Sequence, residues 1–201
     1  GFILANGALS ADGTEGTIRQ KMIERGLVEA IVILPRNLFY STDISVTLWI
    51  LNVNKKARVV NRNGAEIHYR DREKEILFMD MRQMGEPFEK KYVRFTEEDI
   101  RKVADTYHNW QREGHTETYT DVPEFCKSVS VDEEGGIADK SFSLVPSKYI
   151  EFVNRDEVVD YDTRMKELQG ELTNILRKEA ESREAVLSVF KSLGYEIKNQ
   201  L

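Results

Sequence analysis

The chain has 201 residues, of which 40% are hydrophobic and 32% are charged, enough for one medium domain with an appended helical element. Its formal net charge is -6, so the chain as a whole lacks the basic balance of a free-standing nucleic-acid-binding domain, and any such contact must be local or shared with partners. A single cysteine excludes an internal disulfide framework, and three histidines are too few to favour a metal site. No apolar run reaches the roughly 18 residues of a membrane span, so we expect a cytoplasmic protein without a membrane partner.

The first residues form an apolar run, Phe2 to Ala5, which predicts a buried strand that starts almost at the first residue. Because no Met or leading segment precedes it, we interpret the chain as one that begins within a fold. A helix is expected from about Glu15 to Arg25, with Thr14 as its N-cap and Gly26 after its end. Its buried face would carry Ile18, Met22 and Ile23.

Residues 27–34 are an almost unbroken apolar run that Pro35 ends, which is typical of a strand covered on both faces. With the first strand and helix it predicts a β-α-β unit with a right-handed crossover in a largely parallel sheet. Residues 45–52 form another apolar strand after a short connection, which suits an antiparallel return. The sequence therefore predicts a mixed sheet.

Asn63-Gly64 lies between two β-prone runs and predicts a protruding hairpin from Arg58 to Arg70. A strand is expected at 76–80, and a helix from Thr96 to about Trp110. Residues 111–152 alternate apolar patches with turns and predict irregular connecting structure. The helix expected from Thr96 to about Trp110 would face the core with Ile100, Val103, Ala104 and Tyr107.

After Asp160 the sequence becomes one long, charged helix that ends near Gly194. A narrow apolar stripe of this length cannot bury itself, so the helix needs a partner helix in this chain or in another. We call this stripe the apolar seam. It comprises Tyr161, Met165, Leu168, Leu172, Ile175, Val186, Val189 and Leu193.

The loop within residues 34–51 is the most promising functional segment, because it places two aromatic side chains, Phe39 and Tyr40, at the end of a central strand. Ligands bind at this position in open α/β sheets. The alternative is that both aromatics only close the edge of the sheet, and spacing alone favours that alternative.

The other candidate residues favour simpler interpretations. His68, His108 and His115 are scattered in polar contexts typical of solvated surface, and no metal ligand set is predicted. Cys126 is expected to be packed rather than nucleophilic. Arg36, Lys90 and Lys91 are expected to be solvated surface residues. The alternative is that they contact the phosphates of a DNA backbone.

Several segments together resemble the modification subunit of type I restriction-modification systems, an adenine-N6 DNA methyltransferase, in its C-terminal part. They are Gly1–Ser10, Glu15–Arg19, Leu34–Leu51, Ile76–Arg82 and Phe142–Tyr149. The resemblance implies the edge portion of a Rossmann-like S-adenosylmethionine-dependent methyltransferase sheet, mixed and with an antiparallel last strand, followed by a long C-terminal helix. We expect residues 1–82 to belong to the catalytic domain, 83–152 to be a helix and irregular connecting region, and 153–201 to be a helical tail for subunit contact.

The resemblance also implies methyl transfer from S-adenosylmethionine to a flipped-out adenine in DNA, with a specificity and a restriction subunit as partners. A flipped base needs aromatic faces and polar contacts. Phe39 and Tyr40 are therefore expected to stack on the base, and Thr42 to contact its edge. The alternative is a non-catalytic interaction module whose helical tail docks a partner subunit.

Three departures from the family pattern stand out. The chain has no Asn/Asp-Pro-Pro-aromatic motif and no Gly-x-Gly loop after a strand, so no catalytic residue is assigned and the cofactor is expected to bind mainly upstream of this chain. The isolated chain is expected to be inactive. Asp43 adds a carboxylate beside the expected DNA pocket, and the Arg58–Arg70 hairpin is longer than usual.

Overall fold

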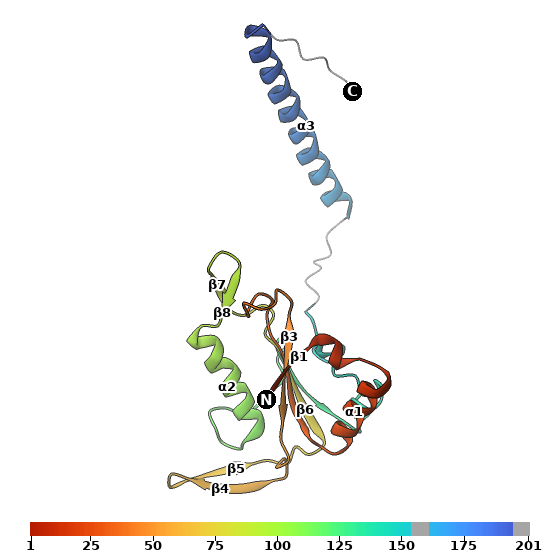
Figure 1. Cartoon of the computed structure of the whole chain (residues 1–201), viewed down its shortest axis with the longest axis vertical. Coiled ribbons are helices and arrows are strands. Elements are labelled where there is room, and N and C mark those ends of the chain that lie inside the picture. Colours follow the sequence, from red (N-terminus) through yellow and green to blue (C-terminus); the bar gives the residue numbers. More distant parts are fainter. Residues whose placement is uncertain (154–160, 195–201) are drawn as a thin grey trace. The chain divides into compact units, whose positions relative to one another are not determined.

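The computed structural model describes residues 1–153 and 161–194. The chain divides into two compact units, residues 1–153 and residues 154–201, and each is described by itself. The first unit is built on a five-stranded sheet with the strand order β1-β3-β2-β6-β9 (Figure 1). The strands are β1 (Phe2–Ala5), β2 (Val28–Ile33), β3 (Val46–Leu51), β6 (Glu75–Asp80) and β9 (Cys126–Ser130).

The sheet is mixed, as predicted. β3 pairs antiparallel with both β1 and β2, which confirms the antiparallel return expected for residues 45–52. β2 and β6 form a parallel pair, and β9 pairs antiparallel with β6. The expectation of a largely parallel sheet is therefore wrong, because β3 lies between β1 and β2 and the two strands of the predicted β-α-β unit do not touch.

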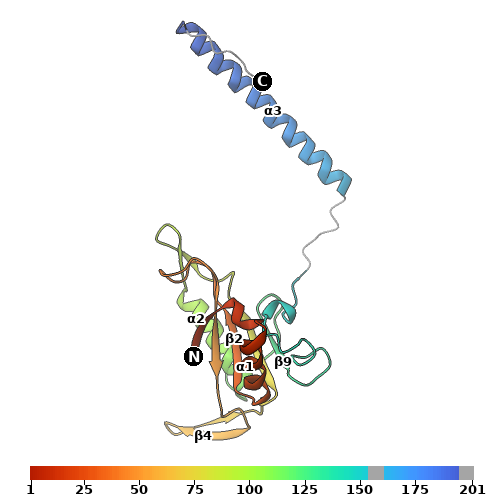
Figure 2. The same cartoon turned by 45° about the vertical axis from the view of Figure 1, so that its right-hand side comes forward.

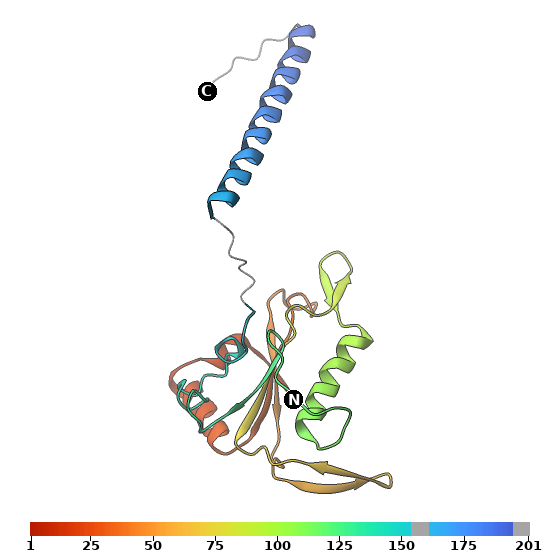
Figure 3. The same ribbon diagram turned by 180° about the vertical axis from the view of Figure 1, so that it is seen from behind.

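Helices cover both faces of the sheet (Figures 1 and 3). The short 3-10 helix η1 (Asn6–Leu9) and the helix α1 (Gly13–Glu24) lie on one face, and α2 (Glu97–Gln111) lies on the other. Alternate residues of β2 point into two separate cores, with Ile31 on the α1 side and Ala30 and Val32 on the α2 side. All six residues of β2 are buried, which confirms a strand covered on both faces.

Two hairpins project from opposite ends of this unit (Figure 1). β4 (Arg58–Arg62) and β5 (Ala65–Tyr69) form the predicted hairpin, and its turn has positive φ at Asn63 and Gly64. Both angles fit the tight turn that Asn-Gly favours. β7 (Glu86–Phe88) and β8 (Tyr92–Arg94) form a second, short hairpin at the opposite end.

Burial and helix capping correct four predictions. β1 is exposed along its whole length rather than buried, because within the described residues it is an edge strand with only β3 beside it. The N-cap of α1 is Asp12, and Thr14 lies inside the helix. Ile18 on α1 and Ile100 on α2 are 54% and 57% exposed, so neither lies on the buried face that was predicted for its helix.

The helix α2 begins with a capping box in which the Thr96 hydroxyl accepts a hydrogen bond from the Asp99 backbone and the Asp99 carboxylate accepts one from the Thr96 backbone. Near the C-terminal end of α2, Trp110 is fully buried in the core. Residues 111–152 are not wholly irregular as expected, because they contain β9, which pairs with β6 (Figure 2). The alternation of polar residues in Cys-Lys-Ser-Val-Ser hid this strand.

A buried polar network joins β2, α2 and the base of the β4–β5 hairpin. The Arg72 Nε donates to Glu29 Oε1 at 2.8 Å, and both side chains are 0% exposed. Gln111 donates to the same carboxylate oxygen at 3.1 Å. The Lys55 ammonium donates to the carbonyls of Val28 and Glu75, at 2.7 and 2.8 Å. This network fixes the hairpin base against the sheet.

The second unit contains α3 (Tyr161–Ser192), as predicted, and Gly194 with φ 81° follows its end. Every residue of the apolar seam is exposed. Among the described residues, no helix combines the length and the apolar character that crossing a membrane requires.

Candidate functional site at the carboxyl ends of the strands

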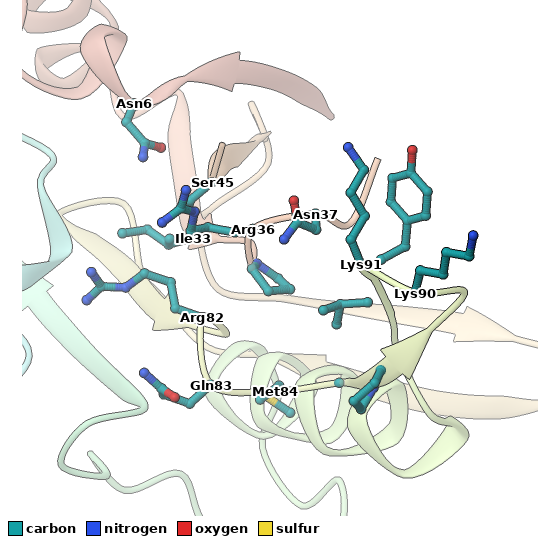
Figure 4. A pocket seen from close by; sticks show the side chains of 15 residues that line it. Asn6, Ile33, Arg36, Asn37, Ser45, Arg82, Gln83, Met84, Lys90 and Lys91 are labelled. Carbon is teal, nitrogen blue, oxygen red and sulfur yellow. The ribbon is translucent and has the colours of Figure 1, made fainter. Parts of the chain in front are cut away.

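A cleft of about 660 Å³ opens at the carboxyl ends of the parallel strands β2 and β6 (Figure 4). Ligands bind at this end of open α/β sheets. Three segments supply most of the cleft lining, namely the loop after β2, the loop after β6 and the β7–β8 hairpin, and Asn6 of η1 adds to it. The polar and charged lining residues on these segments are Arg36, Asn37, Ser45, Arg82, Gln83, Lys90, Lys91 and Tyr92.

The cleft is positively charged although the chain is acidic. Four cations line the cleft (Figure 4). Arg36 lies on the loop after β2, Arg82 on the loop after β6, and Lys90 and Lys91 on the β7–β8 hairpin. No acidic side chain is among its lining residues in the described part of the chain, whereas the net charge of the sequence is -6. A lining of this kind attracts anions.

Tyr40 stands beside this cleft on the loop after β2, with 69% of its surface exposed. Its ring packs edge-on against Tyr92 of β8, with centroids 4.6 Å apart. Its hydroxyl donates a hydrogen bond to the Glu89 carboxylate at 3.4 Å. Partial loss of hydration and the charge of Glu89 raise the pKa of Tyr40.

The other two predicted pocket residues lie differently. Phe39 is half-buried and packs against the core on the α2 side. Thr42 donates its backbone N–H to the Phe39 carbonyl at 3.4 Å, and its hydroxyl accepts from the Ile44 N–H at 3.4 Å. The structure therefore places the three residues in one short turn, but only Tyr40 presents its ring to solvent.

Asp43 is held by a cation of the opposite hairpin. Its carboxylate accepts from the Lys91 ammonium at 3.0 Å, and its backbone carbonyl accepts from Arg36 at 3.5 Å. The Asp43 carboxylate is the main cause of a raised pKa at Lys91. This pairing explains a carboxylate that the sequence left without a role, because it links the loop to the β7–β8 hairpin.

A backbone bond strengthens the same link. The Val93 N–H of β8 donates to the carbonyl of Asn37 at 3.0 Å, and Asn37 itself has φ 59°. The loop after β2 and the β7–β8 hairpin therefore form one connected wall of the cleft. Sequence reasoning missed this wall, and the only local signal was Gly85 and Pro87 beside two consecutive lysines.

Among the four cations of the cleft, Arg82 is the one that the sequence did not single out as a candidate phosphate contact. Its guanidinium donates from Nε and NH2 to Asp80, at 3.0 and 2.6 Å, at the end of β6. Asp80 is buried, and it raises the pKa of Arg82. The pair holds Arg82 at the mouth of the cleft while cancelling much of its charge.

The histidines and the cysteine lie outside this cleft. His108 and His115 are not scattered as expected, since their rings are 5.3 Å apart, and burial lowers the pKa of His108. No group of three or more metal-ligating side chains occurs among the described residues. Cys126 is buried, and desolvation raises the pKa of its thiol, which confirms a packed cysteine.

The cleft residues do not fit S-adenosylmethionine. Nucleotide-like cofactors are typically held by a glycine-rich turn and by a carboxylate that binds the ribose hydroxyls. The described lining offers no carboxylate, and its one glycine, Gly85, serves packing, because an added Cβ would lie 2.6 Å from the Val93 side chain. The lining instead suits a ligand that carries negative charge.

Comparisons with known proteins agree with the resemblance seen in the sequence. The chain is 36% identical over 197 residues to the type I restriction enzyme HindI methylase subunit of Haemophilus influenzae, covering 97% of this chain and 40% of that protein. It is 30% identical over 195 residues to the MjaIX methylase subunit of Methanocaldococcus jannaschii, covering 97% and 32%. The chain thus spans well under half the length of these relatives.

The fold has a counterpart among solved structures. The type I restriction-modification methyltransferase subunit from Streptococcus thermophilus matches with a TM-score of 0.57 at 23% identity, over 74% of this chain and 26% of that one. This likeness supports the predicted Rossmann-like fold. The sequence profile of the N-6 DNA methylase family matches residues 1–158, and the chain therefore belongs to the N-6 DNA methylase family.

Proposed function

We propose that this chain is the C-terminal part of a modification subunit that transfers a methyl group from S-adenosylmethionine to the N6 amine of adenine in DNA. Family membership over residues 1–158 supports the reaction class. The observation that carries the assignment of the site is the exposed Tyr40 ring at the rim of a cation-lined cleft. The methyl group comes from the cofactor, and this chain supplies binding surface.

The loop after β2 is the proposed target-base loop. A base that leaves the DNA stack needs an aromatic face, and the exposed ring of Tyr40 offers one. Phe39 lies next to it and continues the aromatic surface into the core. Thr42 is the proposed polar contact to the base edge. The hydrogen bond from the Ile44 N–H leaves the donor of the Thr42 hydroxyl available for that contact.

The cofactor and the catalytic residues belong, in this proposal, to parts of the protein outside residues 1–201. The exposed edge of β1 supports this division. Phe2, Ile3 and Leu4 are exposed, and β3 is the only strand that pairs with β1 among the described residues. A further strand on this edge would extend the sheet and cover these apolar side chains.

The partners of the proposed protein are DNA and the specificity and restriction subunits of a type I complex, in the cytoplasm. The exposed apolar seam of α3 supports a docking role in this assembly. The alternative, a non-catalytic interaction module, draws on the same seam, but the family match over residues 1–158 does not favour it. Deleting residues 161–201 is expected to weaken binding of the specificity subunit, as measured by analytical ultracentrifugation of the mixed subunits. Unchanged assembly would contradict the docking role.

The target-base loop is tested in the complete methyltransferase that contains this chain. Tyr40→Ala is expected to lower the methylation rate about 5- to 150-fold, because stacking of a base on an aromatic ring contributes about 1 to 3 kcal/mol. Adenine flipping, followed by 2-aminopurine fluorescence at the target position, should fall with it.

Two control variants separate stacking from general damage. Tyr40→Phe keeps the ring and loses the hydrogen bond to Glu89, and should retain most activity. Phe152→Ala removes another exposed aromatic and should change neither signal. If Tyr40→Ala and Phe39→Ala both left methylation and flipping unchanged, the target-base loop would be wrongly assigned.

A further inference from the structure

The β7–β8 hairpin projects from the sheet and carries two lysines, Lys90 and Lys91, at its tip. Glu89 and Lys90 have φ of 42° and 46°, and the Tyr92 N–H donates back to the Glu89 carbonyl at 3.1 Å. At the base of the hairpin, the Arg94 guanidinium pairs with Glu86 at 2.7 Å. The tip is therefore held in a defined position by its own backbone rather than by a packed core.

The charges at the cleft are not equally available to a ligand. The buried Asp80 neutralises Arg82, and Asp43 pairs with Lys91. Lys90 is exposed, and it takes part in no ion pair within the described residues. Arg36 is exposed too, and its guanidinium donates to the backbone carbonyl of Asp43, which leaves its charge uncompensated.

The ion pair between Lys91 and Asp43 is easily exchanged. Its side chains are 56% and 60% exposed, and exposed pairs contribute at most about 1 kcal/mol. A phosphodiester offers Lys91 the same kind of anionic oxygen acceptor as the Asp43 carboxylate. An incoming phosphate can therefore take the place of Asp43 without exposing an unpaired buried charge.

We propose that the β7–β8 hairpin binds the DNA backbone beside the target base, with Lys90 and Lys91 contacting phosphates. Until DNA binds, Lys91 stays in its ion pair with Asp43. This role rests on the proposed function, since it assumes that the ligand is DNA. Because Tyr92 packs on Tyr40 and Val93 bonds to Asn37, a phosphate held by the tip also fixes the position of the target-base loop. Backbone binding and base stacking are thus connected through one wall of the cleft.

The test measures DNA binding by the complete methyltransferase at a series of salt concentrations. Two duplexes are used, one with the recognition sequence and one without it. Each phosphate contact contributes about 0.9 to the slope of log K against log salt. Lys90→Gln and Lys91→Gln should each reduce the slope by about 0.9, equally on both duplexes.

A matched control is available at the other end of the sheet. Lys56 is an exposed lysine that pairs with Glu73 at 3.8 Å, so Lys56→Gln removes the same charge and a similar ion pair. The slope of log K against log salt for Lys56→Gln should stay at the wild-type value. Asp43→Asn should tighten binding several-fold, because it frees Lys91, and this gain should shrink in the Lys91→Gln background.

Three results would overturn the proposal: unchanged slopes in both hairpin variants, an equal loss in Lys56→Gln, or weaker S-adenosylmethionine binding with normal DNA binding. The last result would identify the anion as the cofactor carboxylate. The binding measurement needs neither methylation nor base flipping. If only the target-base assignment failed, the slope reductions in Lys90→Gln and Lys91→Gln would still be observed. If only the hairpin role failed, the loss of methylation in Tyr40→Ala would still be observed.

Discussion

Arg72→Met is expected to be strongly destabilising, because it removes one partner of a fully buried ion pair. Arg72 and Glu29 are both 0% exposed and lie 2.8 Å apart. The same guanidinium also donates to the carbonyls of Arg70, Asn54 and Lys55. The variant would leave a carboxylate without its counter-ion between β2 and the hairpin base. Breaking a buried pair in this way costs about 3 to 5 kcal/mol.

For a chain of this size, that loss corresponds to a fall of about 6 to 20 °C in Tm. Urea unfolding followed by tryptophan fluorescence would measure the free energy directly, since Arg72 lies 5.9 Å from the ring of Trp110. Arg183→Met is the surface control. Its pair with Glu179 is 46% and 52% exposed, and its loss should cost at most about 0.5 kcal/mol.

The double variant Glu29→Met/Arg72→Met distinguishes loss of a counter-ion from loss of packing. Replacing a buried pair with apolar side chains of similar size is often neutral, so the double variant should recover roughly half of the loss or more. The reasoning would be refuted if Arg72→Met unfolded within about 1 kcal/mol of the wild type, or if the double variant were as unstable as Arg72→Met.

Two further variants test the buried basic groups. Burial lowers the pKa of Lys55 to about 8 from 10.5, so between these pH values the unfolded chain holds a proton that the folded chain has lost. Stability of the wild type relative to Lys55→Met should therefore rise by up to about 3 kcal/mol from pH 7 to 10.5 in urea titrations, and a flat difference would argue against the shift. Arg19 donates to the carbonyls of Ala8, Ala11 and Phe142, and Arg19→Met should lower the free energy of unfolding by about 3 kcal/mol, with partial rescue in Arg19→Lys. A loss under about 1 kcal/mol in thermal or chemical unfolding would contradict that role.

The sequence by itself determined the elements whose signals are local. The apolar run ending at Pro35 predicted β2, the Asn63-Gly64 pair predicted the β4–β5 turn, and Thr96 with Asp99 predicted the start of α2. Each of these depends on residues a few positions apart, where periodicity and capping act directly. The aromatic pair Phe39 and Tyr40 was found in the same way, from its position after a central strand.

Only the tertiary structure decided which surfaces these elements share. It left β1 exposed at an edge, added β9 to the sheet, and turned Phe39 towards the core while Tyr40 faced solvent. It also brought Lys91 to Asp43, although 48 positions separate them. Burial and ion pairing across such separations depend on how β2, β6 and the hairpin pack together, and no local pattern in the sequence carries that information.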